Sequence, residues 1–119
     1  MKAENIPLYD LADLKNQTGN DDDFLHQMVI LFIKQTSENL ERITLSIQQK
    51  NWGETHFIVH KMKPTINLFG IKSLKQIIVE TEELSRDTIN EKKILENLKL
   101  IEKVLKQCIA QIKIEFNIE

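Results

Sequence analysis

Apolar residues recur three or four positions apart over two long stretches of this chain, residues 25–47 and residues 94–112. The recurring residues are Leu25, Val29, Phe32, Thr36, Leu40, Ile43 and Ile47 in the first stretch, and Ile94, Leu98, Ile101, Leu105, Cys108 and Ile112 in the second. Thr36 is the only polar member of the first set. This spacing places the residues in a stripe along one side of a helix. We therefore expect two long amphipathic helices.

Local signals indicate where the expected helices begin and end. The sequence predicts a short helix that stops near residues 18–20, a long one over residues 20–50, a third over 51–70, a fourth over 71–87 and a fifth from residue 88. Asn51 is a possible cap of the third helix. Thr88, with Glu91 three residues later, matches the capping box at the start of the fifth.

Glycine and proline are scarce, with three and two residues among 119. An all-β domain needs many tight turns, and these residues are the main signals of turns. The fold class that we expect is therefore all-α. Four amphipathic helices with short connections imply an antiparallel up-down four-helix bundle, with a short additional N-terminal helix. A chain of this length forms one domain, residues 1–119.

The composition excludes several classes of protein. The longest apolar run, from Met28 to Ile33, has six residues, whereas a membrane-spanning helix needs about 20. The first residues show no export signal, and a net charge of −2 lacks the basic excess that nucleic-acid binding draws on. The lone Cys108 cannot form an internal disulfide and fits a reducing compartment. We expect a cytoplasmic protein without membrane insertion or a nucleic-acid partner.

His60 falls on the outer side of the expected third helix. On a wheel with about 100° per residue, Ile58, Met62 and Phe69 lie opposite it, so His60 should project into water. Its neighbours on the wheel are His56, Pro64 and Asn67, with Lys63 to one side and Phe57 and Leu68 to the other. An exposed neutral imidazole is a nucleophile, for which phosphorus is a natural electrophile.

The run from His60 to Gly70 resembles the signature of histidine-containing phosphotransfer (HPt) domains. That signature reads His-x-x-Lys-Gly, then small and apolar residues, then a glycine ten positions after the histidine, and His60, Lys63 and Gly70 match it in type and spacing. The resemblance covers most of the chain and also includes Tyr9-Asp10-Leu11, Leu14, Gly19-Asn20-Asp21, Phe24-Leu25, Leu74 and Glu82-Glu83-Leu84. The family's fold is an antiparallel four-helix bundle with an added short helix.

The resemblance implies a role for each residue of the site. His60 would accept a phosphoryl group from an aspartate of a receiver domain and pass it to an aspartate of another. Lys63 would stabilise the phosphate. Glu82 stands where family members often place a Glu or Gln that hydrogen-bonds the other ring nitrogen. The expected docking residues are His56, Phe57, Pro64, Asn67 and Leu68.

The resemblance also implies partners and cofactors. The partners would be response-regulator receiver domains and a hybrid sensor histidine kinase, and the chain would act as a monomeric phosphocarrier, not an enzyme. It would hold no cofactor, because the receiver supplies the magnesium ion. Pro64 departs from the signature, in which glycine follows the lysine. Proline removes the bond to the carbonyl of His60 and should bend the helix there, but we expect phosphotransfer to survive.

Other interpretations stay open. A helical adaptor would bind a receiver or kinase without accepting phosphate. A metal-binding bundle would use His56 and His60, which lie four residues apart, but Phe57 takes the place of the zincin glutamate, and we expect no metal site. Glu82 could instead pair with Arg86, one turn further along its helix.

Overall fold

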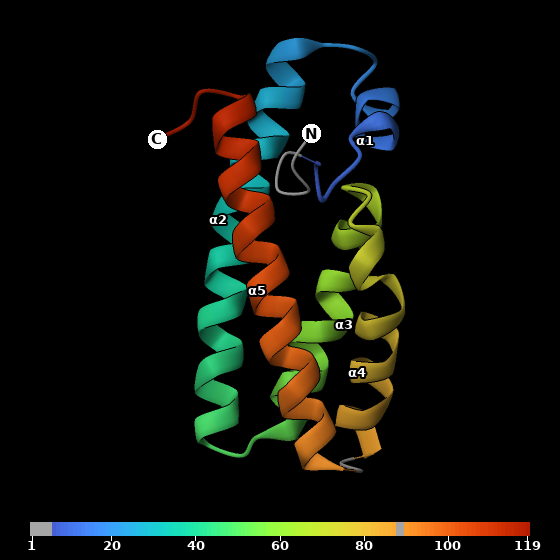
Figure 1. Cartoon of the computed structure of the whole chain (residues 1–119), viewed down its shortest axis with the longest axis vertical. Helices are drawn as coiled ribbons and strands as arrows, with labels where there is room; N and C mark the ends of the chain where they lie inside the picture. The colour runs from blue at the N-terminus through green and yellow to red at the C-terminus, as the bar shows by residue number, and fades with distance from the viewer. Residues whose placement is uncertain (1–5, 88–89) are drawn as a thin grey trace.

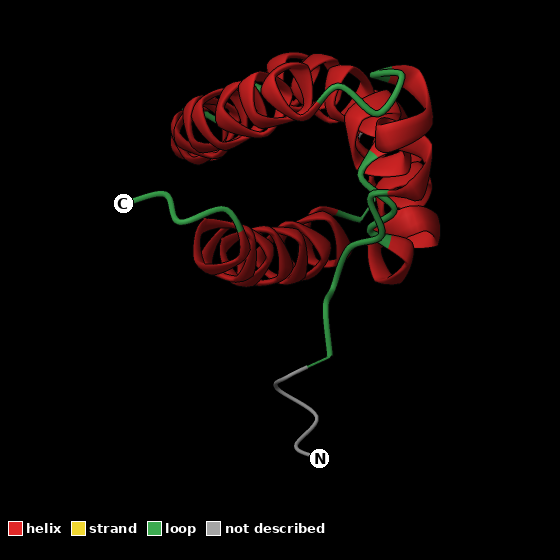
Figure 2. Cartoon of the chain, turned by 90° about the horizontal axis from the view of Figure 1, so that it is seen from above, coloured by secondary structure: helices red, strands yellow, loops and turns green. Residues whose placement is uncertain are grey.

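The protein, described by a computed structural model over residues 6–87 and 90–119, is built from helices, with no strand in these ranges (Figures 1 and 2). In chain order the helices are α1 (Ala12–Gln17), α2 (Asp22–Gln48), α3 (Trp52–Leu68), the short 3-10 helix η2 (Lys72–Leu74), α4 (Lys75–Asp87) and α5 (Glu91–Glu115). The predicted all-α class is confirmed.

The four longer helices, α2, α3, α4 and α5, alternate in direction along the long axis of the molecule (Figure 1). Viewed along that axis, the helices lie around a common interior (Figure 2). Within the described ranges, none of the helices combines the length and the apolar character needed to cross a bilayer.

Side-chain caps fix the starts of α2 and α3. A carboxylate oxygen of Asp21 accepts a hydrogen bond from the backbone N–H of Phe24. The side-chain oxygen of Asn51 does the same for the N–H of Glu54. These N–H groups have no partner within their own helix, so each cap stabilises the helix start. Both helices begin where the acidic run and Asn51 predict.

The start of α5 differs from the prediction. Asn90 is the N-cap: its side-chain oxygen accepts a hydrogen bond from the N–H of Lys93 at 3.2 Å, and its φ angle is 62°. Asparagine enters this left-handed region more readily than most residues. Asn90 therefore has the capping role that the sequence assigned to Thr88, and α5 begins at Glu91. Thr88 itself lies outside the described residues.

The apolar stripes form one core. All six residues predicted for the stripe of α5 are buried, Cys108 included. In α2 every predicted member is buried except Ile47, which is half-buried. Phe32 of α2 stacks on Phe69 with ring centroids 4.1 Å apart. The periodicity therefore predicted the core of both long helices, with Ser46 as the one buried residue of α2 outside it.

The buried side of α4 includes two hydroxyl residues. Thr81 and Ser85 are buried, whereas Leu84 is half-buried. The hydroxyls of Thr81 and Ser85 donate to carbonyl oxygens one turn back in the helix, each at 2.7 Å, so both are buried without an unpaired polar atom. The small side chains are compatible with the extensive contact between α3 and α4.

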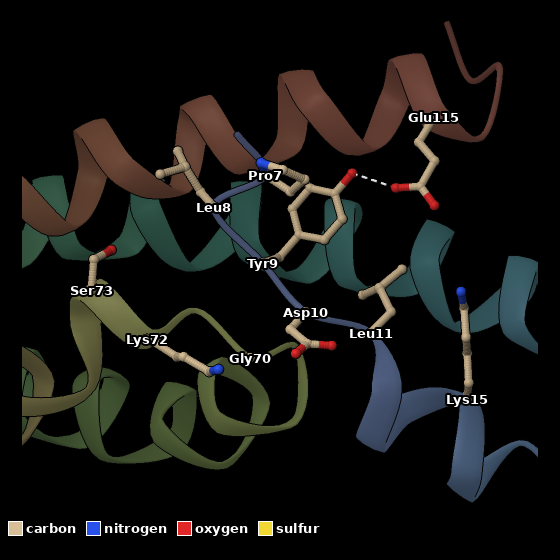
Figure 3. Close-up of a pocket in the computed structure, with 10 residues that line it drawn as sticks. All are labelled: Pro7, Leu8, Tyr9, Asp10, Leu11, Lys15, Gly70, Lys72, Ser73 and Glu115. Atoms are coloured by element: carbon tan, nitrogen blue, oxygen red, sulfur yellow. Dashed lines mark hydrogen bonds between the residues drawn. The ribbon is translucent and has the colours of Figure 1, made fainter. Parts of the chain in front are cut away.

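Residues 6–11, which we call the N-terminal strap, precede α1 and lie against α5 (Figure 3). The hydroxyl of Tyr9 donates to the carboxylate of Glu115 at 2.5 Å. The backbone N–H of Asp10 donates to the carbonyl of Phe69 at 3.1 Å. The strap thus ties the start of the described chain both to the last helix and to the turn after α3.

Candidate functional site

His60 lies on the outward side of α3, and 62% of its side chain is exposed. Ile58 and Met62, which the wheel places opposite it, are buried. The prediction that His60 projects into water is confirmed. An imidazole in this position can be reached by another protein.

Glu82 of α4 contacts two side chains of α3. Its Oε2 lies 2.5 Å from Nδ1 of His60, and its Oε1 accepts a hydrogen bond from Nζ of Lys63 at 2.8 Å. His60 and Lys63 lie three residues apart and so share one side of the helix. The structure brings together the three residues that the sequence singled out for the chemistry.

The contacts favour the ionised form of Glu82. The hydrogen bond from Lys63 is the main cause that lowers the pKa of the carboxyl group; burial opposes this effect, and the hydrogen bond with His60 adds to it. A carboxylate accepts hydrogen bonds but cannot donate them. Nδ1 of His60 therefore carries the ring proton. In the neutral ring Nε2 then has a free electron pair.

Lys63 is held by Glu82. The sequence predicts its ammonium group beside a phosphoryl group on His60, one turn away. An ammonium has three donor hydrogens, and the contact with Oε1 of Glu82 uses one. Among residues 6–87 and 90–119 this ammonium has no other hydrogen-bond partner, so two donor hydrogens remain on the side of α3 that carries His60.

Arg86 does not make the ion pair with Glu82 that the sequence left open. Within the described part of the chain its Nε lies 3.4 Å from a carboxylate oxygen of Asp87, and both side chains are largely exposed. Glu82 points to α3, where Lys63 and His60 offer it two donors.

His56 is half-buried and turned toward α4. Its Nδ1 lies 2.8 Å from the backbone carbonyl oxygen of Glu82. Because a carbonyl oxygen only accepts hydrogen bonds, Nδ1 of His56 carries the hydrogen. The ring lies 6.3 Å from that of His60, centroid to centroid, with 22° between the ring planes. The sequence predicted His56 as part of a docking surface, and its contact with α4 was not foreseen.

The other four predicted docking residues differ in exposure. Phe57 is 54% exposed, Pro64 and Asn67 are exposed, and Leu68 is half-buried against the core. The ammonium of Lys61 lies 5.7 Å from the centre of the Phe57 ring. Helix α3 continues on both sides of Pro64. An exposed aromatic ring and an exposed proline therefore lie on the same helix as His60.

His56 and His60 are the two residues that a metal site on α3 would use. Across residues 6–87 and 90–119, no group of three or more His, Cys, Asp and Glu side chains is placed to hold a metal ion. Both rings engage Glu82 through Nδ1. The expected absence of a metal stays a prediction, which metal analysis of the purified protein would test.

A pocket of about 520 Å³ lies beside the N-terminal strap (Figure 3). Its polar lining comes from Tyr9, Asp10, Lys15, Lys72, Ser73 and Glu115. These side chains carry charges of both signs, and the pocket does not include His60, Lys63 or Glu82. It offers no single charge that would select a ligand, so His60 remains the stronger candidate site.

Glu82→Gln should lower the free energy of unfolding by about 1 kcal/mol at pH 7, since it removes a partly buried charge with two partners. Folding lowers the pKa of Glu82 below the 4.5 of an unperturbed glutamate carboxyl group. The contribution of the carboxylate is therefore fully present above that value and is lost as the pH falls through the lower folded-state pKa. Urea unfolding of both proteins at pH 7 and at about pH 3 should show a difference that shrinks in acid.

The matched control is Glu83→Gln. Glu83 is the exposed neighbour of Glu82 on α4, and its replacement should leave the free energy of unfolding within about 0.5 kcal/mol of the wild type. An equal loss at both pH values in Glu82→Gln would show that the ionised carboxylate does not stabilise this site.

Comparison of the chain with protein-family models and with curated proteins gave no match, and neither did comparison with solved structures. The arrangement of His60, Lys63 and Glu82 is therefore the basis for assigning a function.

Proposed function

We propose that the protein is a histidine phosphotransfer domain, an antiparallel up-down four-helix bundle with a short additional N-terminal helix. In this proposal His60 accepts a phosphoryl group from a receiver-domain aspartate and passes it on in a two-component phosphorelay. One observation carries the proposal: His60 is exposed, and Glu82 holds its Nδ1. The nitrogen left with a free electron pair is Nε2.

The proposed transfer requires no other catalytic group from this chain. The electron pair on Nε2 of His60 forms a bond to phosphorus, and the bond from phosphorus to the aspartyl oxygen breaks, which releases the aspartate as a carboxylate. The imidazole ring then carries a positive charge and keeps its hydrogen on Nδ1. The carboxylate of Glu82, 2.5 Å from Nδ1, offsets this charge as it develops.

In this proposal Lys63 stabilises the phosphoryl group once it is bound to His60. A phosphoryl group on Nε2 brings negative charge to the surface of α3. The donor hydrogens of the Lys63 ammonium that Glu82 does not use can bind a phosphoryl oxygen. The magnesium ion and the acidic pocket belong to the receiver in this proposal, which agrees with a site on this chain made of one nucleophile and two charged neighbours.

The proposed docking surface includes three exposed residues, Phe57, Pro64 and Asn67, and one half-buried residue, Leu68. The ring of Phe57 is 54% exposed. Binding of a partner that covers this ring is favourable, because it removes apolar surface from water. The surface lies on the helix that presents His60, so a receiver bound there would have its aspartyl phosphate near Nε2.

The experiment that tests the proposal uses a panel of receiver domains, each phosphorylated with radiolabelled acetyl phosphate. At least one should label the protein, and the label should be lost in acid and kept in alkali, as expected for phosphohistidine. Mass spectrometry of the alkali-treated protein should place the phosphoryl group on His60. A label that is stable in acid would contradict the proposal.

A helical adaptor is distinguished in the same experiment. An adaptor would bind a receiver without taking label, and it would bind equally well after His60 is replaced. Binding to the panel, measured by calorimetry alongside the labelling, separates the two functions.

A further inference from the structure

Three side chains on one side of α3 converge on a single residue of α4. His60 and Lys63 bind the carboxylate of Glu82, while His56 binds its backbone carbonyl at 2.8 Å. His56 precedes His60 by four residues, about one helical turn. The backbone and the side chain of Glu82 are therefore held to α3 at separate points.

The contact of His56 has a different effect from the other two. A backbone carbonyl moves with its helix, so the hydrogen bond from His56 fixes the position of α4 at residue 82 relative to α3. The carboxylate of Glu82 lies at the end of a flexible side chain, and its reach to Nδ1 of His60 depends on that backbone position. His60 is 62% exposed, so packing contributes little to holding its ring.

A second donor to the same carbonyl provides an internal comparison. The hydroxyl of Ser85 shares its one hydrogen between the carbonyl oxygen of Thr81 at 2.7 Å and that of Glu82 at 3.1 Å, and all three residues belong to α4. Its hydrogen bond therefore cannot set the distance between α3 and α4. Only the bond from His56 reaches that carbonyl from the helix that carries His60.

We propose that His56 is a positioning residue for His60. By donating its Nδ1 hydrogen to the carbonyl of Glu82, it keeps the carboxylate of Glu82 against Nδ1 of His60. His60 then stays in the tautomer whose Nε2 is unprotonated and ready to attack phosphorus. The functional consequence rests on the proposed phosphotransfer, whereas the effect on the tautomer of His60 does not.

The test compares three variants with the wild type. His56→Phe keeps a planar ring of similar size and removes the donor. His56→Asn restores a donor, because an asparagine amide nitrogen occupies roughly the place of Nδ1 of histidine. Ser85→Ala removes the donor to the same carbonyl that comes from within α4, and serves as the matched control.

Two measurements are made on each protein. The ¹⁵N chemical shifts of the His60 ring give its tautomer populations, and the initial rate of labelling by a phosphorylated receiver gives its reactivity. In His56→Phe the preference of His60 for the Nδ1–H tautomer and the transfer rate should both fall about three- to tenfold, the effect of one net hydrogen bond. His56→Asn should recover most of both, and Ser85→Ala should change neither. Should His56→Phe not fold, His56→Leu takes its place as the variant without a donor.

The outcomes separate the two proposals. Unchanged tautomer populations in the variant without a donor would overturn the positioning role of His56, whether or not the protein accepts phosphate. Equal losses in His56→Asn and His56→Phe would also overturn it, since the donor would then be irrelevant. A wild-type protein that takes no label would refute phosphotransfer, and the tautomer measurement would still decide whether His56 orients His60.

Discussion

Replacement of His60 with glutamine should reduce phosphoryl labelling of the protein to background without unfolding it. A glutamine amide has no nitrogen electron pair that can attack phosphorus, so the proposed nucleophile is lost completely. The side chain of His60 is 62% exposed, and the glutamine amide can still donate a hydrogen bond to Glu82. We therefore expect the free energy of unfolding to change by no more than about 0.5 kcal/mol. Labelling by the receiver panel and urea unfolding provide the two measurements.

His26→Gln is the control for this prediction. His26 is a half-buried histidine of α2 whose ring lies 6.2 Å from that of Phe116, and nothing places it near Glu82. This variant should be labelled like the wild type. Persistent labelling of His60→Gln would refute the assignment of His60 as the phosphoacceptor, and loss of label in His26→Gln would move the site elsewhere.

Gly70→Ala should cost about 2–4 kcal/mol of the free energy of unfolding, from left-handed strain and overpacking together. Gly70 has a φ angle of 60°, and a Cβ atom there would lie 2.4 Å from the backbone oxygen of Asp10 and 2.9 Å from its nitrogen. Backbone atoms cannot rotate away as a side chain does. The strap would have to leave the turn after α3 and give up the hydrogen bond from Asp10 to Phe69. Figure 3 shows Asp10 beside Gly70.

Gly19→Ala is the matched control, because Gly19 has a φ angle of 63° but nothing within 4 Å of the added Cβ. It should cost only the backbone strain, about 1 kcal/mol. Urea unfolding of both variants separates the steric contact from the backbone conformation. Equal losses at Gly70 and Gly19 would show that the approach of the strap does not require glycine.

The sequence predicted the helices and their buried sides well, because burial of an amphipathic helix follows its own periodicity. Residues such as Leu25, Ile101 and Ile112 are buried as their spacing indicates. The exposure of His60 followed from the same arithmetic, since its opposite side carries Ile58 and Met62. Predictions of this kind depend on one helix at a time.

The contacts between helices were harder to predict. A helical wheel places His56 next to His60, but it does not show that α4 covers His56 and leaves His60 exposed. The contact of Lys63 with Glu82 could not be predicted for the same reason, because the two residues lie on different helices. The resemblance to HPt domains implied that Glu82 lies beside His60. That Glu82 also accepts hydrogen bonds from Lys63 and, through its backbone carbonyl, from His56 came only from the structure.

The structural role of Gly70 is also something that the sequence could not predict. The resemblance to HPt domains singled out this glycine by its spacing from His60, without a physical reason for its presence. The structure supplies one: the backbone of Asp10, sixty residues earlier in the chain, passes too close for any side chain at position 70. Contact between segments so far apart in sequence cannot be deduced from local patterns.

The strap also constrains the order in which the protein can fold as it is made. Tyr9 bonds to Glu115, 106 residues later. The strap residues are synthesised well before α5, so their binding site does not exist until almost all of the described chain has been made. Closing so large a loop is also entropically expensive. Residues 6–11 should therefore reach their final positions late in folding, although they are synthesised before the helix that binds them.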